Sequence, residues 1–543
     1  MTPRARRALF SLVLFFTVCA VVGTVLQRRV GAQSPEDESQ LRDSLKDFTS
    51  IYALVEQNYA EPLTGQKADD AIYDGAIPGM LRTLDPHSTF YDPKAYAALQ
   101  QDQSGHYFGV GMMIEQQGNK VYVLTPYENT PSYRAGIHPG DLIVAVDGKS
   151  TQGWTSDQVA KALKGPRGTT VEITMQRYGV SKPLVFKLTR AEIPHPSIDL
   201  KYMLQPGIGY IHITQFQETT GEELRETLKS FGNLKGLVLD LRNNPGGLLS
   251  QAVSVCNQLL AKGQVIVSQR GRAYPDQVYR ASSGNGGKTF PIVVLVNGGT
   301  ASAAEIVSGA LQDHDRALIV GQTTFGKGLV QTVYNLSNNT GLALTTYHYF
   351  TPSGRLIQRN YKGVSLYDYF YDHAGALAPN ASNREVKLTD SGRPVYGGGG
   401  ITPDFKLPAQ KLSDFQDELL YKDVFFHFAP VYVANHTVDQ NFQVNDAVLS
   451  EFKQYLSKQG IQWTDAELNG VTDWLKTQIK AKIFTIKFGQ LAGLRVLANA
   501  DPEIQKAVTY LPQAEALEQR AIKIDKEKAL ARNEGEQGVP TQP

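Results

Sequence analysis

Ser302 has the surroundings that a nucleophilic serine needs. It follows the apolar run Pro291–Val296 and two glycines, and it stands where a helix from Ala303 to Leu311 should begin. A hydroxyl there is exposed beside unpaired backbone N–H groups, which favour negative charge. Those groups could stabilise the oxyanion that forms when a serine attacks a carbonyl. Taken alone, a serine in this place is usually a plain helix cap.

A single lysine supplies a base for that serine. Lys327 lies between Gly326 and Gly328 in an otherwise uncharged stretch. A lysine in a poorly hydrated pocket has a lowered pKa and can take a proton from a hydroxyl. Gln331 lies four positions further on, which is the same face of a helix or a strand. Its amide could orient the amine without adding charge.

A pair of glycines supplies the third part of the site. Gly246 and Gly247 follow the apolar run Gly236–Leu241 by a few residues. Glycines at the carboxyl end of a sheet strand offer backbone N–H groups in a cleft. With the N–H of Ala303, one of them would complete an oxyanion hole.

A Ser-His-Asp arrangement is the alternative that the same region offers. His314 stands between Asp313 and Asp315, shortly after Ser302. About three helical turns separate it from the serine, on the order of 15 Å, which is too far for a hydrogen bond. We interpret His314 as a cation at the end of a helix.

The elements around these residues predict an α/β multidomain fold. Strand candidates at 236–241 and 291–296 are each followed by a loop and a helix, at 248–260 and 303–311, which favours a mostly parallel sheet. Residues 100–189 read as a β-rich module of short strands and glycine turns. Residues 34–99 and 409–543 read as helical regions, the latter with a polar, disordered tail. The α/β region between them spans 190–408.

The first 33 residues predict a membrane anchor. Arg4, Arg6 and Arg7 precede an uncharged apolar run from Ala8 to Leu26. Basic residues on that side favour a cytoplasmic N-terminus and export of the rest of the chain. We expect a bacterial inner-membrane protein with its catalytic part in the periplasm. A signal peptide cleaved after Val30-Gly-Ala32 is the alternative.

Composition excludes several other classes of protein. The formal net charge is +1 and there is no long basic stripe, so we expect no nucleic-acid partner. The cysteines are Cys19 and Cys256, and the histidines are scattered singly. We therefore expect no disulfide framework, no metal site and no cofactor.

In combination, these motifs resemble the carboxyl-terminal processing peptidases, or tail-specific proteases. Lys327 follows Ser302 by 25 positions (327 − 302) and Gln331 follows Lys327 by 4 (331 − 327), as in that family. The resemblance runs from about residue 40 to 408 and includes three further motifs, at 241–247, 349–358 and 398–404. It implies that Ser302 is the nucleophile, Lys327 the general base and Gln331 its orienting partner. It also implies a crotonase-like α/β core.

The module at 100–189 resembles a PDZ domain. Its stretch at 108–114 looks like the carboxylate-binding loop of those domains, and Ala135–Gly148 looks like their second signature. Glycines there let successive N–H groups converge on a terminal carboxylate, and the next strand can pair with an extended peptide. The expected substrate-binding residues are Phe108, Gly109, Val110, Gly111, Met112, Met113 and Ile114. For the last three, packing in the strand core is an equally good interpretation.

The sequence thus predicts an exported endopeptidase that binds protein C-terminal tails and cleaves near them through an acyl-enzyme. Expected partners are proteins or peptides with free C-termini, the membrane, a second copy of the chain in a homodimer or higher oligomer, and an adaptor protein. Two alternatives stay open: a non-catalytic PDZ scaffold on an inactive peptidase fold, and a crotonase-like enzyme for acyl thioesters.

Overall fold

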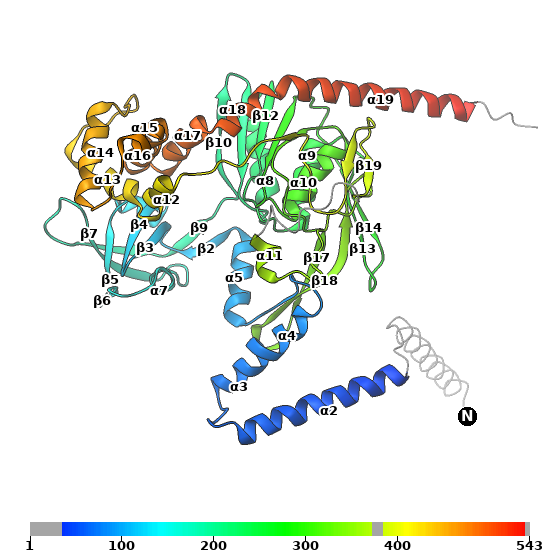
Figure 1. Cartoon of the computed structure of the whole chain (residues 1–543), viewed down its shortest axis with the longest axis horizontal. Coiled ribbons are helices and arrows are strands. Elements are labelled where there is room, and N and C mark those ends of the chain that lie inside the picture. The colour runs from blue at the N-terminus through cyan, green and yellow to red at the C-terminus, as the bar shows by residue number, and fades with distance from the viewer. Residues whose placement is uncertain (1–34, 372–383, 538–543) are drawn as a thin grey trace, which may run out of the picture. The chain divides into compact units, whose positions relative to one another are not determined.

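A computed structural model describes residues 35–371 and 384–537, which fall into two units divided between Thr83 and Leu84 (Figure 1). The described part of the first unit is helical, as expected. It consists of α2 (Pro35–Asn58), α3 (Gln66–Asp70), the π-helix η1 (Ala71–Ala76) and α4 (Ile77–Arg82). The anchor expected in residues 1–33 lies outside the described residues. Within the described ranges, no helix is both long and apolar enough to cross a membrane.

A six-stranded sheet forms the centre of the second unit. Its order is β10-β11-β12-β15-β16-β21, and every neighbouring pair is parallel except β10 with β11. The bounds are β10 (Ile198–Gln205), β11 (Ile208–Ile213), β12 (Gly236–Asp240), β15 (Ile292–Val296), β16 (Leu318–Gly321) and β21 (Phe405–Lys406). All residues of β12 and β15 are buried, as their continuous apolar runs require when helices cover both faces. The predicted α/β core is confirmed.

Two groups of helices cover the two faces of this sheet. On one face, α8 (Thr220–Phe231), α9 (Leu249–Leu259) and α10 (Ala303–Asp313) pack against Leu237, Leu239 and Val294. On the other, α17 (Gln490–Ala500), α18 (Pro502–Thr509) and α19 (Leu511–Gln537) pack against Val238, Val293 and Leu295. The end of the chain therefore completes the core that carries Ser302.

A second, antiparallel sheet lies beside the first. It contains β1 (Thr89–Tyr91), β13 (Val265–Arg270), β14 (Gln277–Arg280), β17 (Leu329–Asn335) and β18 (Gly341–Phe350). The long β18 pairs with both β1 and β17, and so connects the start of the unit to the strand of Gln331. The remaining elements of this part are α5 (Pro93–Ser104), η2 (Ser337–Asn339), α11 (Leu366–Tyr371) and the hairpin of β19 (Val386–Leu388) with β20 (Pro394–Tyr396).

The β-rich module has its own core and its own sheet of order β3-β4-β5-β7-β8, with β6 beside β5. The strands are β3 (Met112–Gln117), β4 (Lys120–Pro126), β5 (Leu142–Val146), β6 (Lys149–Ser150), β7 (Thr170–Gln176) and β8 (Leu184–Thr189). Its helices are α6 (Pro131–Arg134) and α7 (Ser156–Leu163). The chain enters through β2 (His106–Gly109) and leaves through β9 (Ala191–Pro194), which pair with each other. This pairing makes the module an insertion into the larger unit.

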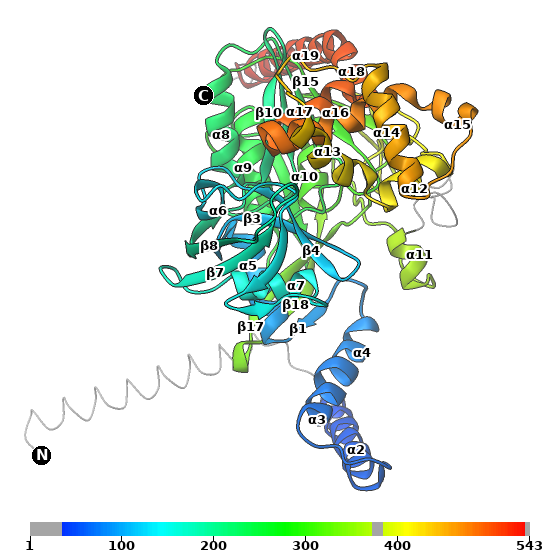
Figure 2. The same cartoon turned by 90° about the vertical axis from the view of Figure 1, so that its left-hand side faces the viewer.

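A further group of helices follows the core in sequence and is seen in Figure 2. It consists of α12 (Asp414–Tyr421), α13 (Val424–Asn435), α14 (Asp446–Lys458), α15 (Asp465–Gly470) and α16 (Thr472–Phe488). These helices share a separate aromatic core in which Phe425 stacks on Phe452 with ring centroids 5.3 Å apart.

Candidate active site

The loop after β15 presents Ser302 in a strained backbone conformation. Ser302 has φ 52° and ψ −115°, a region that residues other than glycine rarely adopt. Thr300 holds the loop, because its hydroxyl accepts from Asn297 N–H at 2.9 Å and donates to Leu241 O at 2.8 Å. As predicted, α10 begins at the next residue, Ala303.

The carboxylate of Glu305 connects the serine loop to the lysine loop. It accepts from the N–H groups of Ser302 at 2.8 Å, Gly326 at 2.7 Å and Lys327 at 2.9 Å, and from the hydroxyl of Thr324. The side chain is fully buried, and burial raises the pKa of Glu305 to about 7 against the lowering effect of those hydrogen bonds. We did not predict this role, although Ser302-Ala-Ala-Glu305 has the spacing of a capping box.

Lys327 is half-buried in the loop between β16 and β17. Burial lowers the pKa of the Lys327 ammonium, and the charges of Glu305 and Asp85 partly oppose that effect. The preceding Gly326 has φ 89°, and a Cβ there would meet Gly400 N at 2.9 Å. A glycine is therefore needed for the lysine loop to approach the 398–401 segment this closely.

Gln331 lies on β17, just after an irregularity of register between Val330 and Gln331. Its amide Nε2 donates to Thr345 Oγ1 on β18 at 3.1 Å. Lys327 itself precedes the strand, so the simple same-face relation of a regular strand does not apply here. The pairing of Gln331 with the lysine amine stays a prediction.

The structure brings the expected oxyanion residues together. A Cβ on Gly246 would lie 2.7 Å from Ser302 Cβ and 2.9 Å from Ala303 N. Gly246 N–H, however, donates to Asn244 Oδ1 at 2.8 Å. Of the two glycines, Gly247 is therefore the better candidate to share an oxyanion with Ala303 N–H.

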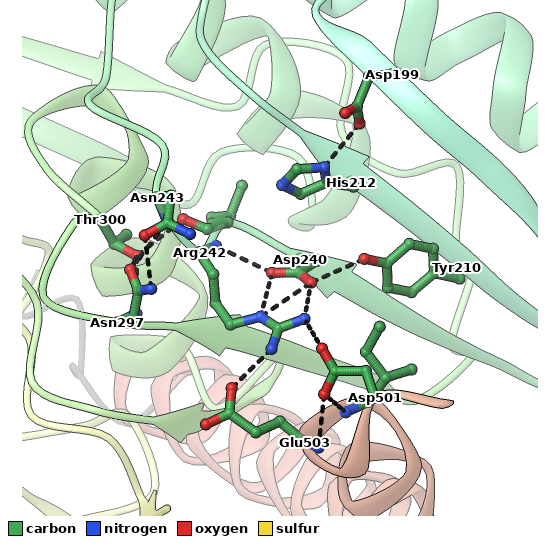
Figure 3. A network of polar contacts seen from close by, with 12 residues as sticks. Asp199, Tyr210, His212, Asp240, Arg242, Asn243, Asn297, Thr300, Asp501 and Glu503 are labelled. Carbon is green, nitrogen blue, oxygen red and sulfur yellow. Dashed lines mark hydrogen bonds and ion pairs between the residues drawn. The ribbon is translucent and has the colours of Figure 1, made fainter. Parts of the chain in front are cut away.

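A charged network surrounds Arg242, which precedes the two glycines in the loop after β12 (Figure 3). Arg242 pairs with Asp240 at 2.6 Å, with Asp501 at 2.9 Å and with Glu503 at 2.7 Å. Burial lowers the pKa of Arg242, but the hydrogen bonds and charges of Asp240 and Asp501 outweigh it, so the net pKa is raised. Because Asp501 and Glu503 belong to the C-terminal helical region, that region helps to position the active-site loop.

Asparagines join the glycine loop to the serine loop. Asn297 Oδ1 accepts from Asn243 N–H at 2.9 Å, and its Nδ2 donates to Asn243 Oδ1 at 2.9 Å (Figure 3). Ala301 N–H donates to Asn244 O at 2.9 Å. The two loops therefore form one hydrogen-bonded assembly around Ser302.

His314 does not lie next to the serine. It is the C-cap of α10, where its Nδ1 contacts Asp390 at 2.7 Å and its Nε2 contacts Val265 O at 2.7 Å. The Ser-His-Asp alternative therefore has no geometric support. In the described ranges, no group of three or more His, Cys, Asp or Glu residues could hold a metal ion.

The expected peptide-binding loop lies at an open edge of the PDZ-like sheet. β3 is an edge strand, so its outer side can accept an added strand. Gly111 has φ 79° and packs against Thr130, whose hydroxyl donates to Gly111 O at 2.9 Å.

Some side chains of the expected peptide-binding residues point into the core of the PDZ-like module, and others point away from it. Met112 and Ile114 pack in the module's core, whereas Met113 lines a cavity of about 1210 Å³ shared with Pro430 and Leu491 of the C-terminal helices. Phe108 is exposed, Gly109 and Val110 are buried, and Val110 O accepts from Ser132 N–H at 2.9 Å.

Comparison with known proteins identifies the class of protein. The model of peptidase family S41 matches residues 207–365, a PDZ domain model matches 122–177, and a family of unknown function (DUF8443) matches 417–489. The chain is thus a serine-type protease with a PDZ domain.

Individual relatives narrow the class to one family. The carboxy-terminal-processing protease of Bartonella bacilliformis is 39% identical over 353 residues, which cover 64% of this chain and 80% of the relative. The carboxy-terminal processing protease CtpA of Bacillus subtilis is 34% identical over 360 residues, covering 65% and 75%. Among solved structures, a photosystem II D1 C-terminal processing protease is 28% identical and covers 66% and 92%, with a TM-score of 0.33. The chain belongs to the carboxy-terminal processing proteases.

Proposed function

We propose that this protease cleaves exported proteins near their C-terminal tails, with Ser302 as nucleophile and Lys327 as general base. One observation carries the proposal: a single buried carboxylate, that of Glu305, binds the backbone N–H groups of both residues. The carboxylate of Glu305 thereby fixes the backbones of both proposed catalytic residues relative to each other. The lowered pKa of Lys327, caused by burial, suits an amine that must accept a proton.

The reaction follows from these positions. Lys327 takes the proton of Ser302 as the hydroxyl oxygen attacks the peptide carbonyl. Ala303 N–H and Gly247 N–H donate to the oxyanion, and Gln331 orients the lysine amine. The leaving amine takes the proton from the lysine. A water molecule deprotonated by Lys327 then hydrolyses the acyl-enzyme, and the lysine returns that proton to Ser302 Oγ as the ester bond breaks.

Substrate selection is assigned to the PDZ domain. A terminal carboxylate would bind the N–H groups of the loop 109–112, and the preceding residues would pair with the outer edge of β3. The open edge of β3 supports this mode of binding.

The location and assembly of the protein belong to the same proposal. We assign the apolar run Ala8–Leu26 to a membrane anchor and the catalytic part to the periplasm. α2 exposes Leu41, Leu45, Phe48 and Val55 at helical spacing, which favours pairing with a second copy of the chain. An adaptor that presents substrates is a further expected partner.

The experiment compares cleavage of an unfolded protein with an apolar tail by residues 34–543 and by their Ser302→Ala and Lys327→Ala variants. Both variants should lose at least about a thousandfold in kcat/KM. Ser308→Ala is the matched control, because that buried hydroxyl on the same helix donates only to backbone carbonyls of its own helix, Ala304 O at 2.9 Å and Glu305 O at 3.4 Å, and its loss should leave cleavage intact. Retained tail binding without cleavage by any form would instead support the scaffold alternative.

A further inference from the structure

The segment Asp85–Ser88 lies against the loop that carries Lys327, although more than two hundred residues separate them in sequence. The ring of His87 meets the ring of Phe325, two residues before the lysine, edge to face with centroids 6.4 Å apart. Asp85 is 7% exposed, and its carboxylate accepts from His87 N–H at 2.7 Å, Ser88 N–H at 2.8 Å and Ser88 Oγ at 2.7 Å. The segment precedes β1 and is not part of the stretch that the peptidase family model matches.

One hydrogen-bonded route leads from this segment to Gln331. Ser88 Oγ accepts from Thr345 N–H at 3.1 Å, and Thr345 Oγ1 accepts from Gln331 Nε2 at 3.1 Å. The pairing of β18 with both β1 and β17 supports the same connection through the backbone.

A second route leads to the residue after the lysine. His87 Nε2 contacts the Tyr369 hydroxyl at 2.9 Å, and that hydroxyl accepts from Gln358 Nε2 at 3.1 Å. Gln358 Oε1 in turn accepts from Gly328 N–H at 2.8 Å. The segment is therefore linked to two residues close to Lys327 in sequence, Gln331 of β17 and Gly328.

Glu305, Asp85 and His87 interact electrostatically with Lys327, and further titratable groups interact with one of these three residues. Element by element, the set comprises Glu305 of α10, Asp85 and His87 before β1, Tyr349 of β18, Arg359 and Tyr361 after that strand, and Tyr369 of α11.

Glu305, His87 and Asp85 differ in the charge that they place near Lys327. Glu305 already accepts four hydrogen bonds, and burial raises its pKa to about 7, so below that pH it loses its charge. The imidazole of His87 stays neutral, because burial and the charge of Lys327 lower its pKa to about 3. Asp85 is the other carboxylate whose charge favours the protonated lysine.

We propose that Asp85 is a positioning residue for the base: its buried carboxylate stabilises the Lys327 ammonium and sets the pH range in which the lysine can accept a proton. The proposal rests on the proposed function, in which Lys327 is the general base. The carboxylate acts through the lysine and does not touch the substrate.

The test compares Asp85→Asn with Ser88→Ala. An asparagine keeps an oxygen for the N–H groups of His87 and Ser88 but removes the charge. The alanine removes the Ser88 hydroxyl bonds and leaves the charge in place, so it controls for local damage. Without the anion the ammonium is less stable, and the lysine becomes neutral at lower pH.

The acid limb of the pH profile of kcat/KM should therefore move to lower pH in Asp85→Asn and stay in place in Ser88→Ala. We expect the ratio of kcat/KM at about pH 6 to that at about pH 9 to rise about threefold or more in Asp85→Asn. An unchanged limb, or one that moves to higher pH, contradicts either the role of Asp85 or the role of Lys327 as the base, and direct titration of the lysine distinguishes the two.

Direct titration of the lysine separates this inference from the proposed function. In the inactive Ser302→Ala background, the NMR signal of ¹³C-labelled Lys327 is assigned by its loss in Lys327→Arg and followed against pH with and without Asp85→Asn. Titration at an unchanged pH overturns the role of Asp85. A shifted titration with an unshifted activity profile supports the role of Asp85 and shows that Lys327 is not the base. Asp85→Ser, which also caps a turn without charge, gives the same readout where Asp85→Asn does not fold.

Discussion

At the scale of single residues, Glu305 holds Ser302 and Lys327, the proposed nucleophile and base, through their backbones. Each carboxylate oxygen accepts from two donors: Oε2 from the N–H groups of Ser302 and Lys327, and Oε1 from the Thr324 hydroxyl and Gly326 N–H. Glu305→Gln therefore puts an amide N–H₂ against one of these pairs of donors. We expect kcat to fall about 10- to 100-fold with little change in KM, since small displacements of catalytic groups are costly. Steady-state kinetics measure this split. Thr324→Val, which removes one of the four bonds and keeps the charge, should cost less, and equal losses would contradict the assignment.

The same carboxyl links stability to pH. Burial raises the pKa of Glu305 from its ordinary 4.5 to about 7, so between these values the folded state binds the proton more tightly than the unfolded chain. Its contribution to stability is therefore full below about pH 4.5 and is lost as the pH rises through about 7. The difference in unfolding free energy between wild type and Glu305→Gln should decline across that window and be flat above it. Urea unfolding at a series of pH values measures it, and a difference that grows with pH would show the opposite shift.

The residues that the sequence identified differ in kind from those it missed. Ser302 and Lys327 stand out because each has an unusual local context, a loop before a helix and a lysine between glycines. Asp85 and His87 carry no such signal, because their importance depends on a contact with a loop far away in sequence. Nothing in the local sequence distinguishes a turn that contacts the loop of Lys327 from a turn that does not.

At the scale of elements, the loops after β12 and β15 form the proposed oxyanion hole. Gly246 has φ 101°, and a Cβ there would meet Ser302 Cβ and Ala303 N. Gly246→Ala should lower kcat about 100-fold or more because it displaces the serine or its N–H donors. Gly263→Ala is the matched control: φ is 89°, so the backbone strain is similar, but nothing lies within 4 Å of the added Cβ. Similar activity losses in both variants would mean that strain alone, and not the contact with Ser302, is responsible.

The elements themselves were predictable where their patterns are local. The apolar run 236–241 became β12, the run 291–296 became β15, and the predicted helix from Ala303 became α10. In the PDZ-like module, the run Leu142–Val146 is β5. The antiparallel sheet around β18 was not predicted, since β1 has three residues and its partner lies about 250 positions away. A strand that short is specified by its pairing and not by its own sequence.

At the scale of the whole molecule, the region after residue 408 divides into parts with different roles, which its helical pattern could not reveal. Helices α17–α19 complete the peptidase core. Leu511 of α19 is 5% exposed, and a Cβ on Gly236 of β12 would lie 2.9 Å from its Cδ1, so the helix packs directly on the sheet. Helices α12–α16 instead surround their own aromatic core, in which Phe452 contacts Phe425 and Phe428 with ring centroids 5.3 Å and 5.1 Å apart.

This division predicts different consequences for two substitutions that shorten a buried side chain, one in each core. Leu511→Ala should destabilise the peptidase core by about 2–5 kcal/mol, and Phe452→Ala should destabilise the α12–α16 helices by about 3–5 kcal/mol. We expect Leu511→Ala to lower the urea concentration at which hydrolysis of a short peptide is lost. Phe452→Ala should leave that midpoint nearly unchanged while limited proteolysis begins to cut within residues 413–489. Because both substitutions empty a buried site, each serves as the control for the other. If Phe452→Ala lowered the activity midpoint as much as Leu511→Ala, the helices and the core would unfold as one cooperative unit, and α12–α16 would be part of the peptidase fold itself.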